Sequence, residues 1–380
     1  MRIEVRLPRV EPEVYSEPKE CPKCGCRHFK PHGVQGEQKT IRDLGYEEVK
    51  SFRQKCLRCG YTMRVYPRGV SNAQQSDRLK AITVLLYVLG LSYGAVSDFV
   101  GALGCYVCRT TVYNNVQEAG REARQRQGAS VKGGGKRPVV GADGTYVKVK
   151  GEQVGIEVVV DDESGELLGL EIIVSENRAE VLEIIQEVVE EVDADVIVSD
   201  DHGAYKETAL ALGLAHQICR SHVKRNVDEL AESIGQQQKR NEPLPEDVDS
   251  SPERLREDLE VLRQLVRARP EDALDQLEKM YDRYKAAPGP KKGQRHTVWY
   301  RTRMLVTRLW DRWPNLTLDQ RRDDLDGTNN SCERVIGWWI KERYRTMRGY
   351  KRPESIRNVV TLTARMGARS GRYDMMELYM

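Results

Sequence analysis

The spacing of apolar residues changes several times along the chain, and each change predicts a different kind of structure. Residues 1–20 carry three prolines among charged side chains and predict a loose N-terminal arm. Short β-type stretches occupy residues 21–70, and apolar residues at helical spacing follow in residues 75–130. The basic, Gly-rich run VKGGGKR at residues 131–137 predicts a flexible linker, so we expect a domain boundary there.

From residue 138 to residue 230 the pattern favours a mixed sheet flanked by helices. Three β-rich runs separated by turn signals, GADGTYVKVK, QVGIEVVVDD and LLGLEIIVS, predict a three-strand meander. A helix over residues 177–192 and a short buried strand, DVIVSD, which ends at Asp200, predict a crossover unit. Helix, strand and helix signals continue to the end of this segment and extend the predicted sheet.

Charged residues and leucines alternate at helical spacing after residue 230. Patterns such as LREDLEVLRQLVRA predict exposed helices supported by opposite charges four residues apart. We expect an all-helical insertion over residues 231–322, after which the sheet-containing domain resumes over residues 323–380 and ends in a basic helix. The predicted fold class is therefore multidomain, with α+β and α/β parts.

Residues 75–130 predict three helices joined by short turns, one of which contains glycine. This rhythm is typical of a helix-turn-helix, whose last helix enters the major groove of DNA. The polar side chains at the start of that helix suit phosphates or base edges, and they are Arg109, Thr111, Asn114, Asn115 and Gln117. A plain helical hairpin with no DNA role has the same periodicity and stays an alternative.

The distribution of charge adds to this picture. The formal net charge is only +3, but residues 1–140 and 231–380 are basic and residues 141–230 are acidic. A basic part can hold phosphates and an acidic part divalent cations, although uneven surface solubility would give the same asymmetry. The longest apolar stretch, residues 81–100, is interrupted by Gly, Ser, Tyr and Asp, and the N-terminus lacks the apolar run of a secretory signal. We therefore expect an intracellular protein with no membrane partner.

Four of the nine cysteines form two Cys-x-x-Cys pairs, each followed by glycine: Cys21, Cys24, Cys56 and Cys59. Paired knuckles of this kind present four thiolates tetrahedrally to Zn²⁺, so we expect a zinc ribbon with one structural zinc over residues 21–70. Three neighbours could substitute as ligands, namely Cys26, His28 and His32. The basic residues around the knuckles suit contact with DNA, or form a solvated rim.

Two aspartates belong to the ends of predicted strands. Asp143 lies in the first strand of the meander, and Asp200 ends the strand after the crossover helix. In a ribonuclease H-like topology these sheet ends lie side by side, so the two carboxylates should meet. Carboxylate oxygens are hard ligands for Mg²⁺, and a pair of such ions can cut a phosphodiester. Asp201 competes with Asp200, but it looks like part of the turn onto the next helix.

A third carboxylate should come from a late helix, and Glu333 lies in the first turn of the helix predicted by DGTNNSCERVIGWWIKERYR. A purely structural role, as part of a helix cap, fits the position of Glu333 equally well. With Asn330 as N-cap, Glu333 falls three residues later and could complete a capping-box-like arrangement instead of binding a metal. The local sequence does not separate these two roles.

The motifs GADGTYVKV, VIVSDDHGAY, HQICRSHVKRNV and TNNSCERVI, in this order, resemble those of the Mutator-like transposases of eukaryotes and their bacterial insertion-sequence relatives, within the DDE (ribonuclease H-like) superfamily. The resemblance covers residues 140–228 and 325–365. It implies that Asp143, Asp200 and Glu333 form the catalytic triad, with Mg²⁺ or Mn²⁺ as cofactor. It also places Cys219 and His222 on a Cys-x-x-His signature. Two ligands alone make a poor zinc site, so we expect a structural or DNA-positioning role for this pair.

The implied function is that of a DNA transposase, which cleaves at transposon ends and joins the freed strand to target DNA. The implied partners are double-stranded DNA, as terminal inverted repeats and as target, and a second copy of the chain in a homodimer or higher oligomer. In a prokaryote the protein would lie in the cytoplasm, at the nucleoid. Further basic residues expected to touch DNA follow the Cys-x-x-His signature or Glu333, and they are Lys224, Arg225, Arg343, Arg345 and Arg348.

Two other functions fit parts of the same pattern. A non-catalytic DNA-binding regulator derived from such an enzyme would keep the ribbon and the helix-turn-helix, but an intact acidic triad disfavours it. A structure-selective nuclease of the same fold would use the same metal chemistry without strand transfer.

Overall fold

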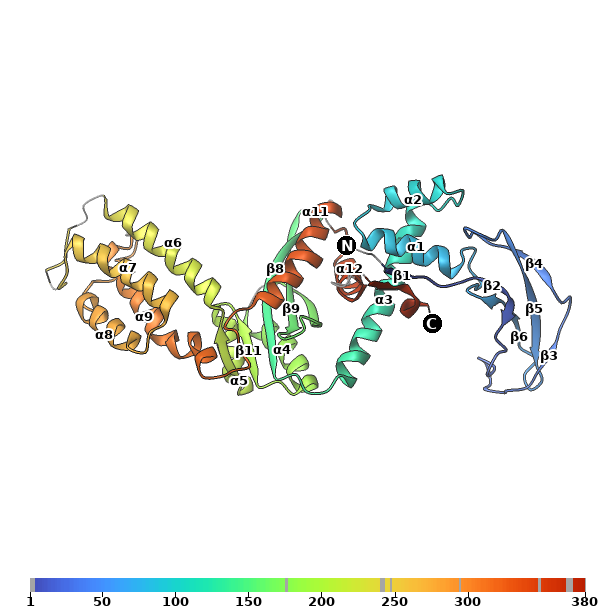
Figure 1. Ribbon diagram of the computed structural model, residues 1–380, viewed down its shortest axis with the longest axis horizontal. Helices are drawn as coiled ribbons and strands as arrows, with labels where there is room; N and C mark the ends of the chain where they lie inside the picture. Colours follow the sequence, from blue (N-terminus) through green and yellow to red (C-terminus); the bar gives the residue numbers. More distant parts are fainter. Residues whose placement is uncertain are drawn as a thin grey trace. The chain divides into compact units, whose positions relative to one another are not determined.

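The computed structural model describes residues 4–174, 177–239, 243–246, 248–293, 295–347, 350–366 and 372–379 (Figure 1). The chain forms two compact units, each assembled from separate stretches of sequence. The first comprises Met1–Ser130, Tyr146–Val154 and Val335–Met380, and the second comprises Val131–Thr145 and Gly155–Arg334. One boundary between the units falls at residue 131. The C-terminal segment, expected to complete the sheet-containing domain, instead belongs mostly to the first unit.

A five-stranded mixed sheet lies at the centre of the second unit. Its order is β10-β9-β8-β11-β12, with the bounds Leu167–Ile173, Glu152–Asp161, Val139–Val149, Val196–Ser199 and Ala215–Ile218. β9 and β10 pair antiparallel, whereas β11 runs parallel to both β8 and β12. The meander and the crossover strand predicted from the sequence are confirmed, and their order is the one expected for a ribonuclease H-like core.

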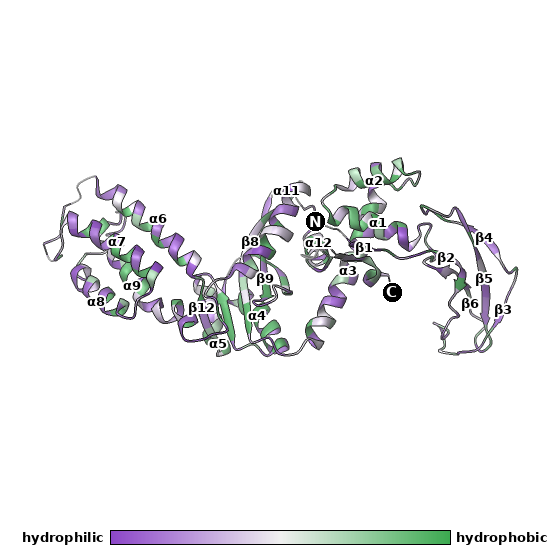
Figure 2. Ribbon diagram, viewed as in Figure 1, coloured by the Kyte–Doolittle hydropathy of each residue, from purple (hydrophilic) through white to green (hydrophobic). Residues whose placement is uncertain are grey.

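Two helices pack on this sheet, α4 (Arg178–Val192) and α5 (Gly203–Leu212). Asn177 begins α4 as its N-cap, because its side-chain oxygen accepts hydrogen bonds from two backbone N–H groups of the first turn. The apolar residues of α4 recur on one face and are buried against β-branched residues of the strands. Figure 2 shows this core as green strands and green helix faces.

The second unit also contains the predicted helical insertion. Its helices are α6 (Arg220–Gln238), α7 (Pro252–Ala268), α8 (Ala273–Tyr284) and α9 (Val298–Leu316), and they share one apolar core. One buried acid, Asp258, accepts hydrogen bonds from the side chains of Arg283 and Tyr284, which offset the cost of its burial. The insertion begins inside α6, since this helix starts at the sheet and continues into the helical core.

The first unit contains the three helices expected from residues 75–130, namely α1 (Asp77–Val88), α2 (Tyr93–Ala102) and α3 (Arg109–Gly133). Serine N-caps begin α1 and α2. α3 extends into the predicted linker, so residues 131–133 are helical rather than flexible. A late helix, α12 (Pro353–Met366), joins α3 through a buried hydrogen bond of 3.0 Å from Asn358 to Gln117.

Short strands complete the first unit. The prediction of a loose N-terminal arm is wrong for two of its segments. β1 (Glu4–Arg6) pairs in parallel with β13 (Arg372–Asp374), and β2 (Glu11–Tyr15) pairs with β7 (Pro67–Arg68). Backbone pairing with distant partners, which local composition does not reveal, orders these stretches. Within the described residues, no helix is long and apolar enough to cross a membrane.

A separate four-stranded sheet carries the paired cysteines. It is formed by β3 (Phe29–Pro31), β4 (Glu37–Thr40), β5 (Glu48–Cys56) and β6 (Thr62–Val65), with β5 pairing to the other three. These strands are mostly purple in Figure 2, because few apolar side chains are available to form a core. A small sheet of this kind needs another source of stability, such as a bound metal.

Candidate active site and metal centres

Two carboxylates lie at the same end of the parallel part of the sheet. β8 and β11 are neighbours, and the last pair in their register is Gly141 with Val198. Asp143 and Asp200 each follow two residues later, so both side chains lie just beyond this ladder. Asp200 Oδ1 accepts a hydrogen bond of 2.9 Å from the backbone N–H of His202, which fixes the carboxylate at the turn onto α5.

The two carboxylates affect each other. Burial and the negative charge of Asp200 raise the pKa of Asp143 to about 7, Glu333 adds to this effect, and His222 opposes it. These three acids therefore belong to one electrostatic site. A divalent cation held between them would replace their mutual repulsion with attraction, and carboxylate oxygens are the ligands that Mg²⁺ and Mn²⁺ prefer.

Glu333 reaches this site from α10 (Asn330–Val335). The preceding residue, Asn329, is buried and donates a hydrogen bond of 2.8 Å to the carbonyl of Ala142, next to Asp143 in β8. A Cβ atom on Gly141 would lie 2.6 Å from the side-chain oxygen of Asn329, so only glycine leaves room for this contact. The start of α10 is thereby attached to the strand that carries Asp143.

The capping alternative for Glu333 finds little support. α10 begins at Asn330, so Glu333 is its fourth residue rather than the third after an N-cap. Its Oε1 atom is shielded from solvent and makes no hydrogen bond within the described part of the chain. This oxygen instead lies 3.4 Å from Nδ1 of His222, at the start of α6.

Cys219 and His222 form a polar pair next to Glu333. Burial opposes ionisation of the Cys219 thiol, but its hydrogen bond with His222 and nearby backbone N–H groups leave its pKa below the ordinary value. The same hydrogen bond raises the pKa of His222. The two side chains therefore favour a thiolate beside an imidazolium.

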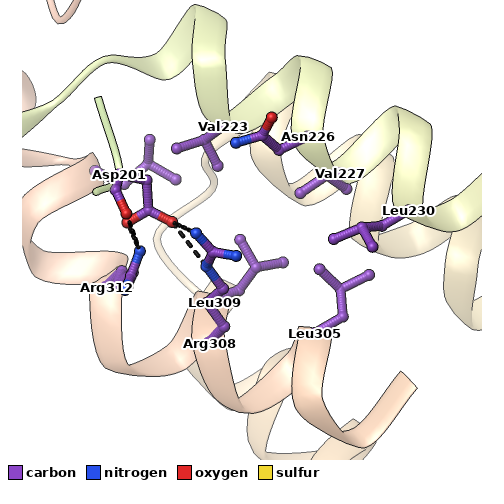
Figure 3. A pocket seen from close by; sticks show the side chains of 10 residues that line it. Asp201, Val223, Asn226, Val227, Leu230, Leu305, Arg308, Leu309 and Arg312 are labelled. Carbon is purple, nitrogen blue, oxygen red and sulfur yellow. Dashed lines mark hydrogen bonds and ion pairs between the residues drawn. The ribbon is translucent and has the colours of Figure 1, made fainter. Parts of the chain in front are cut away.

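Asp201, the competitor of Asp200, has a different environment (Figure 3). Its carboxylate forms ion pairs with Arg308, at 2.6 Å, and with Arg312, and both arginines come from α9 of the helical insertion. Arg312 also donates a hydrogen bond of 2.8 Å to the backbone carbonyl of Asp201. Asp201 thus attaches α9 to the sheet, and Asp200 remains as the carboxylate of the site.

We expect Asp201→Asn to destabilise the helical insertion by about 1–3 kcal/mol, because two arginines lose a charged hydrogen-bond acceptor. Amide hydrogen exchange in α9 should speed up accordingly. Asp200→Asn is the matched control one residue away, and it should leave exchange in α9 unchanged. Equal exchange in Asp201→Asn and the wild type would show that these ion pairs do not hold α9 in place.

The four knuckle cysteines converge, as the sequence predicted. Cys21 Sγ lies 3.6 Å from Cys59 Sγ, and Cys24 Sγ lies 3.7 Å from Cys56 Sγ. Sulfur atoms around a tetrahedral zinc are separated by roughly 3.8 Å, given Zn–S bonds of about 2.3 Å. Backbone N–H groups, first that of Cys59, lower the pKa of Cys56, whereas the neighbouring thiols help to raise the pKa of Cys24, so the four sulfurs titrate as one coupled group. Cys26, His28 and His32 are not part of this cluster.

Removal of zinc from this cluster should unfold the small sheet of β3–β6 and leave the second unit folded, because few apolar contacts stabilise that sheet. We expect Cys56→Ser to lose one equivalent of zinc, as measured by metal analysis after gel filtration of reduced protein. Its affinity for DNA should fall by about tenfold or more. Cys108→Ser, a thiol outside the cluster, serves as control. Metal-free wild type with an intact sheet would contradict the expectation.

The structure separates the residues expected to touch DNA into two groups. Asn115 is buried and donates hydrogen bonds to Gln75 and Thr83. Arg343 is buried with its guanidinium 3.9 Å from the ring centroid of Tyr87. Gln117 is buried as well, and its side chain accepts a hydrogen bond from Asn358. These three residues stabilise the first unit, and their prediction as DNA contacts is wrong. The others are at least partly exposed, namely Arg109, Thr111, Asn114, Lys224, Arg225 and Arg345. Arg348 lies outside the described residues.

Sequence reasoning missed two buried polar residues of the site region. Asn329, described above, lies four residues before Glu333, and only its place in the TNNSCE run could have drawn attention to it. Glu157 on β9 is buried, and its carboxylate accepts hydrogen bonds of 3.0 and 3.2 Å from the hydroxyl of Tyr205. It sits in the middle of an apolar run, where a strand pattern gives no reason to expect a charged group.

Comparison with known proteins identifies the family. The sequence model of the transposase IS66 family matches residues 73–345, and none of the curated proteins matches the chain. Among solved structures, the HTLV-2 integrase catalytic core domain in complex with magnesium is 19% identical, with a TM-score of 0.21 over 34% of this chain and 87% of that one. The BIV integrase catalytic core domain is 15% identical, with a TM-score of 0.19 over 50% and 90%.

The family that matches carries the DDE designation expected from the motifs, but the Mutator-like assignment and its Cys-x-x-His signature are not confirmed by this match. The matched segment includes all three carboxylates and the Cys219–His222 pair, and it begins after the cysteine-bearing sheet. The chain therefore belongs to the IS66 family of transposases.

Proposed function

We propose that this transposase is a metal-dependent polynucleotidyl transferase that cleaves DNA at transposon ends and joins the freed 3′-OH to target DNA. One observation carries the proposal. Asp143, Asp200 and Glu333 come from three separate segments of sequence and share one electrostatic site, where burial and the charges of the two other acids raise the pKa of Asp143. Membership of a transposase family supplies the substrate class.

The three carboxylates would hold Mg²⁺ or Mn²⁺. Two such ions, about 4 Å apart, can activate an attacking oxygen and stabilise the leaving one. Asp200 is fixed for this role by the N–H of His202, and Glu333 by the attachment of α10 to β8 through Asn329. The residues thus arrive at the site already positioned, which lowers the cost of ordering them when metal binds.

DNA binding would come from several elements. The side chains at the start of α3 and α6 that remain exposed can contact phosphates or base edges, and the zinc ribbon adds a basic surface. The partners are double-stranded DNA with terminal inverted repeats, and target DNA. Two transposon ends must be held together for joining, so a homodimer or higher oligomer is the expected assembly. The protein would act at the nucleoid of a prokaryotic cell.

The decisive experiment incubates the full chain with Mg²⁺ and DNA that carries the flanking terminal repeats. We expect cleaved ends and, with a target plasmid, joined products that depend on Mg²⁺ and disappear in Asp143→Asn. Cleavage without joining would favour a structure-selective nuclease. Binding without cleavage in Mg²⁺ or Mn²⁺ would favour a DNA-binding regulator, and either outcome would overturn the proposal.

A further inference from the structure

A second group of ligand atoms lies beside the carboxylates. The Sγ of Cys219, a ring nitrogen of His222 and a carboxylate oxygen of Glu333 are all within 4.8 Å of one another. His222 Nδ1 and Glu333 Oε1 are 3.4 Å apart. Ligand atoms around a tetrahedral zinc lie roughly 3.3–3.8 Å apart, given bonds of about 2.0–2.3 Å. The group is therefore close to the spacing that such an ion requires.

The two facing atoms lie near each other, but neither is hydrogen-bonded to any residue that the structure describes. Both His222 Nδ1 and Glu333 Oε1 are shielded from solvent, and neither makes a hydrogen bond among the described residues. Buried polar atoms are normally satisfied, since leaving one without a partner is costly. Their separation is long for a direct hydrogen bond, whereas an ion between them would bind both.

Cys219 has the surroundings of a metal-binding thiolate. It is fully buried, and its sulfur accepts a hydrogen bond of 3.3 Å from the backbone N–H of Asn329. Such N–H donors stabilise the thiolate, which is the form that binds metal. The Glu333 side chain is 34% exposed, so the group is open on one side to a water ligand.

We propose that Cys219, His222 and Glu333 bind a Zn²⁺ ion with water as the fourth ligand, and that Glu333 is shared between this ion and the magnesium site. Sulfur and nitrogen ligands select zinc, because Mg²⁺ takes oxygen ligands almost exclusively. The sequence shows only the Cys-x-x-His pair, too few ligands for zinc, and the fold supplies the third. The sharing of Glu333 rests on the proposed function, but zinc binding itself does not.

Zinc counting on the full chain tests this site. Reduced, metal-stripped protein is equilibrated with chelator-buffered Zn²⁺, and bound zinc is measured by elemental analysis. We expect two equivalents in the wild type, one for the four knuckle cysteines and one for this site. Cys219→Ser and His222→Ala should each retain one, with affinity for the second weakened at least about 100-fold. Glu333→Gln should also weaken the second ion.

Cys332→Ser is the matched control, because Cys332 is a buried thiol next to Glu333 in sequence but is not part of the group. It should retain two equivalents. An unchanged thermal unfolding transition and circular dichroism spectrum in each variant show that the second unit has folded. Co²⁺ in place of zinc gives a second readout, since the absorption of a one-thiolate site should vanish in Cys219→Ser while that of the four-thiolate site persists.

One equivalent in the wild type, or two in Cys219→Ser, would overturn the proposal. Full zinc affinity in Glu333→Gln would overturn the sharing of this residue. None of these measurements uses DNA or Mg²⁺, so they are independent of whether the protein cleaves or joins DNA. A second zinc in a protein without transposase activity would leave the inference standing and remove the proposed function.

Discussion

Replacing Glu333 by Gln should lower Mg²⁺-dependent cleavage by about 10²- to 10⁴-fold, because a metal ligand contributes several kcal/mol to the transition state and each 1.4 kcal/mol is a factor of ten. Gln keeps the volume of the side chain and removes only its charge. DNA affinity should be unchanged within about twofold. The measurement is single-turnover cleavage of terminal-repeat DNA at saturating protein, in Mg²⁺ and again in Mn²⁺.

Two controls make this result specific. Asp143→Asn and Asp200→Asn should show losses of similar size, since they remove the other carboxylates of the site. If Glu333 only capped its helix, the same substitution would cost at most about 1 kcal/mol of stability and leave cleavage largely intact. Near-normal cleavage would remove Glu333 from the triad and direct attention to the remaining acids nearby in sequence, namely Asp323, Asp324, Asp326 and Glu342.

Magnesium affinity should depend steeply on pH below about 7. The pKa of Asp143 is raised to about 7, so below this pH a proton competes with the cation for the carboxylate. The apparent dissociation constant for Mg²⁺ should therefore rise about tenfold for each pH unit from 7 to 5, and level off above pH 8. Calorimetric titration of the metal, rather than cleavage, avoids the pH dependence of the chemical step.

Two variants test whether the pH dependence of Mg²⁺ affinity comes from Asp143. Asp200→Asn removes the like charge that raises the pKa of Asp143, so the pH dependence should move to lower pH. Asp162→Asn is the control, because burial and Asp326 raise the pKa of Asp162 to about 7 as well, in a group that does not perturb Asp143. An affinity independent of pH between 5 and 7 would contradict the assignment of Asp143 as a ligand.

The same shift affects the stability of the metal-free protein. A carboxyl whose pKa is about 7 in the folded state, against an ordinary value of 3.8, binds its proton more tightly when folded. Its contribution to the free energy of unfolding is therefore fully present below pH 4 and is lost as the pH rises to 7. Asp143→Asn, which carries no charge, should be more stable than the metal-free wild type above pH 7, by about 1–2 kcal/mol.

The sequence predicts the sheet well because its signals are local. Alternating and continuous apolar runs defined the meander and the strand before Asp200, and helical apolar spacing located α4. The two aspartates could be paired from this topology alone, because parallel neighbours in a sheet end at the same edge. The zinc-binding cysteines could also be predicted from the sequence, because the spacing of two Cys-x-x-Cys pairs is typical of a zinc site.

The remaining features depend on contacts that no local pattern contains. Asn115 and Arg343 look like DNA contacts in the sequence, and only the packing of α1 and the ring of Tyr87 show that they are buried. The sequence did not show whether Glu333 caps its helix or belongs to the site. The structure favours the site, because His222 from another segment lies beside it. The composition of the first unit also depends on contacts between distant parts of the sequence, such as the hydrogen bond between Asn358 and Gln117.

The pairing of β1 with β13 has a consequence for synthesis of the protein. Arg6 and Asp374, which form an ion pair in this ladder, are 368 positions apart. At a translation rate of about 5–20 residues per second, the first strand waits roughly 20–70 s for its partner. The helices of the first unit likewise wait for α12, so a prematurely released chain carries the acidic triad's first two members without a completed first unit. Interrupted translation would therefore yield fragments whose first unit is unfinished although β8 and β11 of the second unit have already been made.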